Sequence, residues 1–358
     1  MQPITWSCCP RVAQNPLTRA FIEHLAREQR AASTVENYSR DLEDFLAAFA
    51  DTPFTEMLEA DEVAIARYVD WLHEREARRG GSVLADQLAM VSGSGRTLAP
   101  ATIRRRVCTV RVFYSWCIRL RHRRDVVNPV RLGVRGRERG VVPRRASVPW
   151  VPDERAWSSI LKHLLTHMSV RDQALVLLTH DGALRREEVV RLRVDDIDWR
   201  THTIAVHAAI SKNHMPGTVV LSHPTFTRLK EYVAGDRAML VQLYGAAADG
   251  PIFLSDSRRN PGQPLTKWTV KDIFDRLRDA LDLPHLTPHT MRHLMLTELK
   301  RSGMDLLDVS RYGRHRSLAS TEIYLHTDLS DLARSVARAH ECVAVLLLRT
   351  EEGHDERE

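Results

Sequence analysis

Residues 287–303 read T-P-H-T-M-R-H-L-M-L-T-E-L-K-R-S-G, and this stretch carries the signals of one complete helix. Thr287 is a good N-cap, and Pro288 suits the first turn, where its missing N–H does no harm. Gly303 stands where a helix C-cap belongs. The spacing between these signals predicts a capped helix with one buried side. That side is formed by Met291, Leu294, Met295 and Leu299.

The same helix carries three polar side chains that could do chemistry. His289 and Arg292 are three residues apart and therefore share one helix face. His289 and His293 are four apart, which is also the spacing of a helical zinc pair. No Glu follows the first His as in an HExxH motif, and no third ligand is defined. We therefore expect no metal at this helix.

Around this helix, the second half of the chain is predicted to be mostly helical. Asp153 can cap a helix, and a second helix follows over about 171–180. Strand-like sequence then runs over 203–210 and 218–221, with a polar turn at 212–217 between the two strands. This pattern predicts a helical domain that contains one small antiparallel sheet.

The first half of the chain predicts only helices. Ser33 and Glu36 form a capping-box pattern at the start of one helix, and a second is expected over 61–77. Residues 78–96 are rich in Gly and Ser and indicate a loop or insertion. Pro100 opens a third helix. Its apolar face is formed by Ile103, Val107, Val110, Tyr114 and Cys117.

The charge of the 358-residue chain is concentrated in one segment. The net charge is only +6, but residues 101–150 hold 14 Arg against two acidic residues, a net of +12. Such a segment attracts a polyanion, most simply nucleic acid. The alternative is a solvated surface in a genome that favours Arg codons. Candidate phosphate contacts on the helix and the linker that follows are Arg104, Arg105, Arg106, Arg111, Arg144 and Arg145.

Two classes of protein are disfavoured by composition. The longest apolar run near the C-terminus, 342–348, spans seven residues, whereas a membrane-spanning helix needs about 20. The five Cys contain no C-x-x-C pair, which fits a reducing compartment better than a disulfide framework. We expect a cytoplasmic protein with no membrane partner.

Four stretches, in their order along the chain, carry a family resemblance. They are G-A-L-R-R-E-E-V-V-R-L (182–192), S-K-N-H-M-P-G (211–217), P-H-T-M-R-H (288–293) and Y-G-R-H-R-S-L-A-S-T-E-I-Y-L-H (312–326). The set resembles the tyrosine recombinases, which include phage integrases, Xer recombinases and transposon relatives. The resemblance implies an N-terminal helical (SAM-like) core-binding domain and an α+β catalytic domain with a short antiparallel sheet.

The resemblance also implies a role for each matching residue. Arg185 matches the first catalytic Arg, Lys212 the Lys of the hairpin turn, and Tyr324 the nucleophile. The remaining catalytic positions are His289 and Arg292 of the HxxR motif and His315. Glu188 and His293 match positions that support the site.

This set suits phosphoryl transfer on DNA. Two guanidinium groups can grip the non-bridging oxygens of a phosphodiester and stabilise the charge of the transition state. A Tyr hydroxyl can attack to give a covalent phosphotyrosine, and a Lys can protonate the departing 5′ oxygen. The bond energy stays in the protein–DNA ester, so we expect no metal, ATP or other cofactor.

The chain departs from the family pattern beside the expected catalytic residues. The usual Thr-Gly ahead of the first Arg motif is Gly182-Ala183, and the usual Gly-His is Arg314-His315 with Gly313 one position earlier. Leu296 replaces a usual Ala. All are neighbours of the expected catalytic groups.

The predicted organisation follows from these features. We expect an N-terminal tail (1–15), a DNA-clamp domain (16–130), a basic linker (131–152), a catalytic domain (153–340) and a C-terminal tail (341–358). The resemblance implies a bacterial, nucleoid-associated protein that assembles as a homo-tetramer on double-stranded DNA bearing specific recombination sites. A helix over about 330–348 would dock on a neighbouring protomer or pack on its own domain.

The predicted function is site-specific cleavage and rejoining of duplex DNA through a 3′-phosphotyrosine. Integration or excision of a mobile element is the first hypothesis, because of the 78–98 insertion and the tail. Xer-type resolution of chromosome or plasmid dimers is the second. A non-catalytic DNA-binding protein on the same fold and a metal-dependent nuclease are alternatives from other classes.

Overall fold

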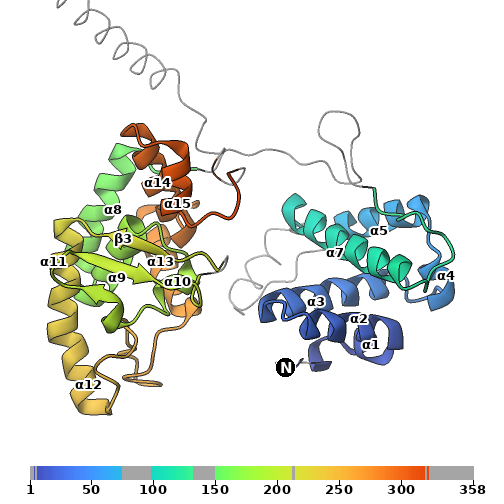
Figure 1. Ribbon diagram of the computed structural model, residues 1–358, viewed down its shortest axis with the longest axis horizontal. Helices are drawn as coiled ribbons and strands as arrows, with labels where there is room; N and C mark the ends of the chain where they lie inside the picture. Colours follow the sequence, from blue (N-terminus) through green and yellow to red (C-terminus); the bar gives the residue numbers. More distant parts are fainter. Residues whose placement is uncertain are drawn as a thin grey trace, which may run out of the picture. The chain divides into compact units, whose positions relative to one another are not determined.

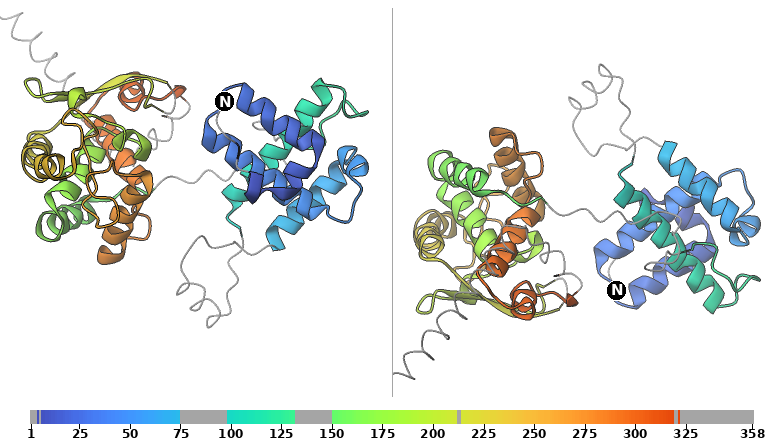
Figure 2. Two further views of the ribbon diagram at one scale, coloured as in Figure 1. Left: turned by 90° about the horizontal axis from the view of Figure 1, so that it is seen from below. Right: turned by 90° about the horizontal axis from the view of Figure 1, so that it is seen from above.

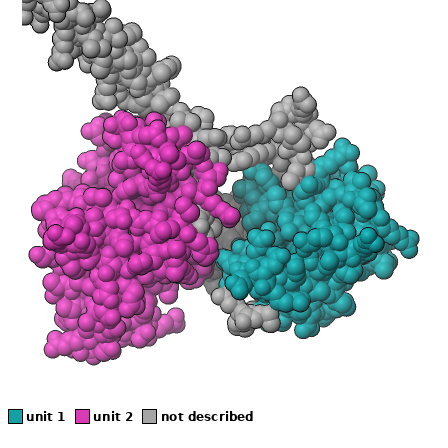
Figure 3. Space-filling view, in the orientation of Figure 1, with its two compact units in different colours: residues 1–146 teal, residues 147–358 magenta. Residues whose placement is uncertain are grey.

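The computed structural model describes residues 4, 6–74, 98–131, 150–211, 214–318 and 321. The chain divides into two compact units, residues 1–146 and 147–358, which Figure 3 colours separately. Several predicted features lie outside the described residues. They are most of the 78–98 insertion, most of the linker, the C-terminal helix and tail, and Arg144, Arg145, Lys212 and Tyr324.

Unit 1 is built only of helices in its described part (Figure 1). α3, α5 and α7 pack on one another, and α2 covers α3 and α7. Aromatic rings fill the space between them, with Phe45 edge-on to Tyr68 at 4.9 Å between ring centroids. The helices are η1 (Trp6–Cys8), α1 (Pro10–Gln14), α2 (Pro16–Arg27), α3 (Ala32–Ala48), α4 (Phe54–Leu58), α5 (Glu62–Glu74) and α7 (Pro100–Arg119).

The structure confirms the helix that begins at Pro100. Pro100 occupies its first turn, and all five residues of the predicted apolar face are buried. A Pro in this position loses no intrahelical hydrogen bond, while the buried stripe gives α7 its place in the core.

Two features at the N-terminal end differ from expectation. We expected residues 1–15 to form a tail, but α1 lies within them, and Cys9 and Val12 are fully buried. The Val12 N–H donates to the Glu43 carboxylate at 3.0 Å, which ties this segment to α3. The Ser33–Glu36 capping box is not formed: the N-cap of α3 is Ala31, two residues before Ser33, and it makes no side-chain bond.

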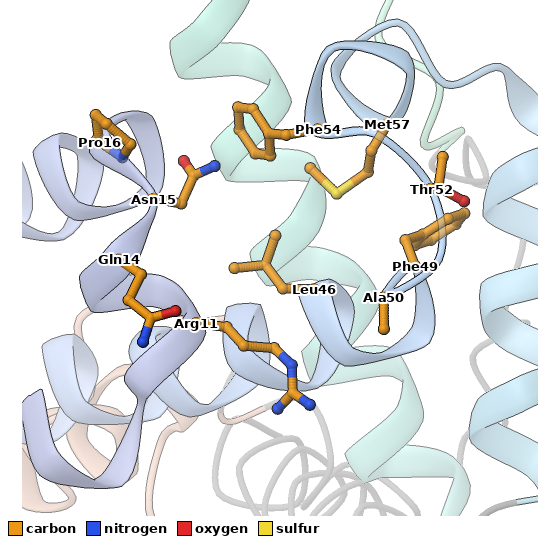
Figure 4. Close-up of a pocket in the computed structure, with 10 residues that line it drawn as sticks. All are labelled: Arg11, Gln14, Asn15, Pro16, Leu46, Phe49, Ala50, Thr52, Phe54 and Met57. Atoms are coloured by element: carbon orange, nitrogen blue, oxygen red, sulfur yellow. The ribbon is translucent and has the colours of Figure 1, made fainter.

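A surface groove of about 370 Å³ lies in unit 1 beside the junction of α1 and α2 (Figure 4). Phe49, Phe54 and Met57 form its apolar wall. Arg11 is its one charged lining residue and pairs with Glu43 at 3.2 Å. The groove therefore holds no group of acidic, basic or nucleophilic side chains.

Unit 2 is a helical domain with one small sheet. Its strands β1 (Ile197–Asp198), β2 (Thr203–Val206) and β3 (Gly217–Val220) pair antiparallel in that order, with Ile204 opposite Ile197 and Val219. β1 was not expected from the sequence. The helices are α8 (Glu154–His167), α9 (Val170–Asp181), α10 (Arg186–Val189), η2 (Val194–Asp196), α11 (His223–Tyr232), η3 (Val233–Arg237), α12 (Ala238–Tyr244), α13 (Lys267–Leu281), α14 (Pro288–Arg301) and α15 (Leu306–Tyr312).

α9 runs through the middle of this unit (Figures 1 and 2). It contacts α8, α10, α11 and α14, and every residue from Arg171 to Asp181 is buried. A helix that is enclosed on all sides needs no polar face. The chain leaves α9 at Gly182, and the position of α9 therefore decides where the next residues, including Arg185, are placed.

The caps predicted in unit 2 are confirmed. The Asp153 carboxylate accepts from the Ala156 N–H at the start of α8, and the Thr287 hydroxyl accepts from the Thr290 N–H at the start of α14. The predicted fold class, mainly helical with a small antiparallel sheet, is likewise confirmed. In the described part of the chain, no helix is long and apolar enough to cross a membrane.

Candidate active site

The C-terminal turns of two helices, α9 and α15, place the first and the last of the four quoted stretches, 182–192 and 312–326. At the end of α9 the Leu184 N–H donates to the Thr179 carbonyl at 3.1 Å, and at the end of α15 the His315 N–H donates to the Ser310 carbonyl at 3.0 Å. In both turns the preceding residue is left-handed, with φ of +43° at Ala183 and +52° at Arg314. This turn usually holds Gly, which explains the family's glycines at these positions.

Arg185 follows the first of these turns and is the N-cap residue of α10. Its Nη1 donates to Oε1 of Glu188 at 2.7 Å, and its backbone N–H donates to Oε2 of the same carboxylate at 3.0 Å. Glu188 is 1% exposed. The carboxylate therefore fixes both the backbone and the guanidinium of Arg185.

Arg292 projects from α14 and is also 1% exposed. Its Nη1 donates to the Ala183 carbonyl and its Nη2 to the Gly313 carbonyl. These two bonds use two of the five N–H donors of a guanidinium. Arg292 thus connects both turns that precede the other motif residues.

His315 lies in the electrostatic field of this Arg cluster. Burial, and then the positive charges of Arg292, Arg185 and Arg314, lower the pKa of His315 to about 3. Its Nδ1 lies 2.8 Å from the hydroxyl of Thr321, a fully buried residue. The imidazole is therefore neutral at neutral pH and held by a hydroxyl.

The two other His residues of α14 lie against each other. The His289 and His293 rings are 4.4 Å apart between centroids, at 73°. Burial, and then the neighbouring His289 and Arg292, lower the pKa of His293 to about 4. Both imidazoles are one helical turn apart and beside Arg292, as the sequence predicted.

The structure thus brings together Arg185, Glu188, Arg292, His293 and His315, from segments up to 130 residues apart in the chain. Lys212 and Tyr324 lie outside the described residues, while Ser211 and Thr321, which stand near them in the sequence, are buried. Across the parts of the chain that are described, no group of three His, Cys, Asp or Glu could hold a metal ion.

Some residues of the site were not predicted from the sequence. Thr321 and Arg314 make direct contacts with predicted site residues, and so do the backbone carbonyls of Ala183 and Gly313. Arg314 was visible in the sequence only as a departure from the family pattern. Carbonyl acceptors leave no signal in a sequence, because every residue type carries one.

The Arg side chains of α7 that were predicted to contact phosphate already have partners within unit 1. Arg105 pairs with Asp41, a carboxylate that is 1% exposed. Arg106 is 14% exposed and pairs with Asp44 at 2.8 Å. Arg111 donates to the Val130 carbonyl. These side chains connect α7 to α3 and to the segment at Val130, so their charges are partly balanced.

Both halves of the chain match known family models. Residues 153–330 match the phage integrase family, and residues 19–120 match the N-terminal SAM-like domain of phage integrases. Arg185, Arg292, His315 and Tyr324 all fall in the first match. The two matches correspond to the two units of the fold.

Individual relatives and solved structures agree with the family models. The chain is 28% identical to tyrosine recombinase XerC of Alcanivorax borkumensis, over 89% of this chain and 92% of the relative. It is 28% identical to tyrosine recombinase XerD of Xanthomonas campestris pv. campestris, over 92% and 93%.

Two solved structures share the fold. The XerH recombinase bound to its difH substrate has a TM-score of 0.63 at 17% identity, covering 93% of this chain and 87% of that chain. The Tn1549 transposon integrase in complex with a circular intermediate DNA has a TM-score of 0.62 at 16% identity, covering 90% and 98%. With two family models that together span most of its length, this chain belongs to the phage integrase family of tyrosine recombinases, which are DNA strand-transferring enzymes.

Proposed function

We propose that this site-specific recombinase cleaves and rejoins duplex DNA with Tyr324 as the nucleophile and the Arg185–Arg292–His315 cluster as the phosphate site. One observation carries the proposal: Arg185, Arg292 and His315 come from three separate segments, and both Arg side chains lie close enough to His315 for their charges to lower its pKa. A buried cluster of cations beside neutral imidazoles is suited to bind a phosphodiester.

The two Arg side chains would stabilise the charge on phosphorus. Hydrogen bonds within the protein fix each guanidinium. Arg185 donates to the Glu188 carboxylate, and Arg292 donates to two backbone carbonyls. Donors that are fixed before the reaction need no reorganisation in the transition state. Two guanidiniums held in this way are suited to the two non-bridging oxygens of one phosphate.

The covalent step would exchange one phosphoester for another. The Tyr324 oxygen bonds to phosphorus, the bond from phosphorus to the 5′ oxygen breaks, and the products are a 3′-phosphotyrosine and a 5′ hydroxyl. Lys212 would donate the proton to the departing oxygen, and neutral His315 would take up or share the Tyr proton. Rejoining is the same step in reverse with the 5′ hydroxyl of the partner strand.

For the biological role we propose integration or excision of a mobile element by a homo-tetramer on paired recombination sites. Four subunits would supply the four strand cleavages that exchange of two duplexes needs. Xer-type resolution of chromosome or plasmid dimers is a second candidate. It is favoured by the names of the curated relatives, which match over most of their length.

The covalent adduct is the decisive test. Purified full-length protein is incubated with a sheared, nicked genomic DNA library, adducts are precipitated in detergent, and the attached DNA is sequenced. We expect wild type to capture a defined site and Tyr324→Phe to capture none. Tyr244→Phe, at a Tyr that is half exposed on α12, is the matched control and should capture the same site.

The captured sequence also separates the hypotheses. Sites that flank an element carrying this gene support the mobile-element role, whereas one isolated chromosomal or plasmid site supports dimer resolution. DNA binding with no adduct indicates a non-catalytic protein on this fold. Cleavage that EDTA abolishes and that leaves no adduct indicates a metal-dependent nuclease. An adduct that persists in Tyr324→Phe would exclude Tyr324 as the nucleophile.

A further inference from the structure

Arg314 is a charged side chain in a place where a charge is costly. It is 1% exposed and, with Arg292, is one of the largest fully buried side chains among the described residues. A buried charge of this kind persists only when it is paired and hydrogen-bonded. Its backbone is left-handed, at φ +52°, which a residue with a side chain rarely adopts. Both facts indicate that the surrounding structure holds Arg314 in place.

The guanidinium of Arg314 is bonded to a carboxylate and to three carbonyls. Its Nη2 lies 3.0 Å from Oε2 of Glu188, 3.1 Å from the Gly182 carbonyl and 3.0 Å from the Ala183 carbonyl. Its Nη1 donates to the Tyr312 carbonyl at 2.9 Å. The side chain therefore connects α10, the turn after α9 and the end of α15.

Each proposed catalytic Arg shares an acceptor with Arg314. Glu188 accepts from Arg185 on Oε1 and from Arg314 on Oε2. The Ala183 carbonyl accepts from both Arg292 and Arg314. In addition, Arg185 Nη2 donates to the backbone carbonyl of Arg314 at 3.3 Å. A displacement of Arg314 would therefore change the surroundings of both other guanidiniums.

A glycine makes room for this side chain. A Cβ built on Gly217, the first residue of β3, would lie 3.1 Å from Cγ and 3.2 Å from Cδ of Arg314. Such contacts are tighter than nearly all real ones. The hairpin, the α9 turn and α10 thus enclose Arg314 together, so a left-handed backbone is held by its context.

We propose that Arg314 is a positioning residue of the recombinase: it anchors Glu188 and the Ala183 carbonyl so that Arg185 and Arg292 face the scissile phosphate. It also neutralises Glu188, so three guanidiniums and one carboxylate leave a net charge of +2 for the phosphate. The proposal rests on the proposed DNA cleavage, but its structural part does not require DNA.

The first experiment measures that structural part alone. The full chain is unfolded in urea, and hydrogen exchange of peptides from α9 is the readout, because α9 reports on unit 2. Arg185→Met and Arg314→Met are combined in a double-mutant cycle, once with Glu188 and once with Glu188→Gln. With Glu188 present, we expect the combined effect of the two substitutions on the unfolding equilibrium constant to differ from the product of their single effects by about threefold or more. With Glu188→Gln, this coupling between Arg185 and Arg314 should be lost or reversed. Additive effects in the presence of Glu188 would overturn the proposal.

The second experiment measures chemistry on the duplex captured by the adduct assay. Arg314→Gly keeps the left-handed backbone and removes the anchor. We expect single-turnover adduct formation to slow by about 10-fold to 100-fold, because the catalytic groups lose their alignment. The dissociation constant for the duplex should stay within about twofold, because most DNA affinity comes from phosphate contacts elsewhere.

Three further variants separate positioning from a general effect. Arg314→Lys should recover part of the rate, while Arg314→Met should recover none. Arg311→Met, at an exposed α15 residue that pairs with Asp308, is the matched control and should react as wild type. A folded Arg314→Gly that reacts at the wild-type rate, or that loses binding in parallel with rate, would refute the positioning role. Failure of wild type to form any adduct would refute the proposed function, and the coupling measurement would then decide the role of Arg314.

Discussion

Nδ1 of His315 lies 2.8 Å from the hydroxyl oxygen of Thr321, three residues before Tyr324 in the sequence. This contact sets the orientation of the imidazole ring, and because a hydroxyl can either donate or accept, it suits both neutral tautomers of His315. It also joins His315 to a residue shortly before the proposed nucleophile within the same stretch, 312–326. The orientation of His315 is thus set by a residue of the same quoted stretch, 312–326, to which the sequence assigned no catalytic role.

We expect Thr321→Val to slow adduct formation by about 10-fold to 100-fold, the usual effect of losing a partner that orients a functional side chain. Thr321→Ser keeps the hydroxyl and should retain most of the rate. The measurement is single-turnover cleavage of the captured duplex. Equal rates for the Val and Ser variants would show that the hydroxyl has no part in the reaction.

Gly313 is predicted to be intolerant of a side chain. A Cβ there would lie 3.2 Å from Cδ1 of Leu296 and 3.3 Å from both Nη2 of Arg292 and Cε1 of His315. Gly313→Ala should therefore displace the two functional groups by a few tenths of an ångström, and we expect the cleavage rate to fall by about 10-fold, less than a shift of about 1 Å would cost.

Gly235 is the matched control for that substitution. It lies in the helical segment η3, and a Cβ there would meet nothing within 4 Å. Gly235→Ala should leave cleavage unchanged and stabilise the fold by about 0.5–1 kcal/mol, because Ala loses less backbone entropy in a helix. The Gly313 prediction is wrong if both variants cleave at the wild-type rate.

The stability of unit 2 should fall in mild alkali through His180. Its imidazole lies 3.1 Å from the carboxylates of both Asp181 and Glu298 and stacks on Trp157. Burial opposes protonation, but hydrogen bonds to the two carboxylates outweigh it and raise the pKa of His180 to about 9, above its ordinary 6.5. Folding therefore favours the protonated form.

The sign of this effect follows from linkage. Because the pKa is higher in the folded state, the extra stability is fully present below pH 6.5 and is lost as pH rises through 9. A shift of this size corresponds to a stability difference on the order of 3 kcal/mol. Urea unfolding between pH 6 and 10 should show this loss in wild type and in His207→Asn, an exposed control, and a flatter profile in His180→Gln. A His180→Gln profile as steep as that of wild type would contradict the assignment.

Two neighbouring Arg residues on α7 should behave differently toward DNA. Arg105 is 43% exposed, whereas Arg106 is 14% exposed and sits between Asp41 and Asp44. We expect Arg105→Gln to reduce the salt dependence of binding to a random duplex of about 30 base pairs by about one unit of slope. Arg106→Gln should leave the slope unchanged and lower the stability of unit 1 by about 1–3 kcal/mol.

Anisotropy titrations between 50 and 200 mM salt would measure both slopes. If both variants lower the slope equally, the ion pairs on α3 do not restrain Arg106, and both residues contact phosphate. If neither changes it, the basic segment acts through other residues, and the assignment of Arg105 to DNA is wrong.

Much of the fold followed from local signals. Asp153 and Thr287 cap the helices they were expected to cap, and the five apolar residues of α7 are all buried. These features depend on neighbours three or four residues away, which a sequence displays directly. The same kind of evidence failed at Ser33, because α3 starts at Ala32 within a packed bundle. It also missed α1, whose burial depends on Glu43 of α3.

The sequence by itself determined which residue types are available for the chemistry and the order in which they occur: Arg185, Lys212, the His289–Arg292 pair, His315 and Tyr324. Only the tertiary structure decided how the described members are held. The bonds that hold Arg292 go to the carbonyls of Ala183 and Gly313, and both Arg185 and Arg314 share Glu188. The Arg292–Ala183 and Arg314–Glu188 contacts join segments more than 100 residues apart. Backbone carbonyls and left-handed turns become specific only when the chain has folded, because their partners are set by packing and not by spacing.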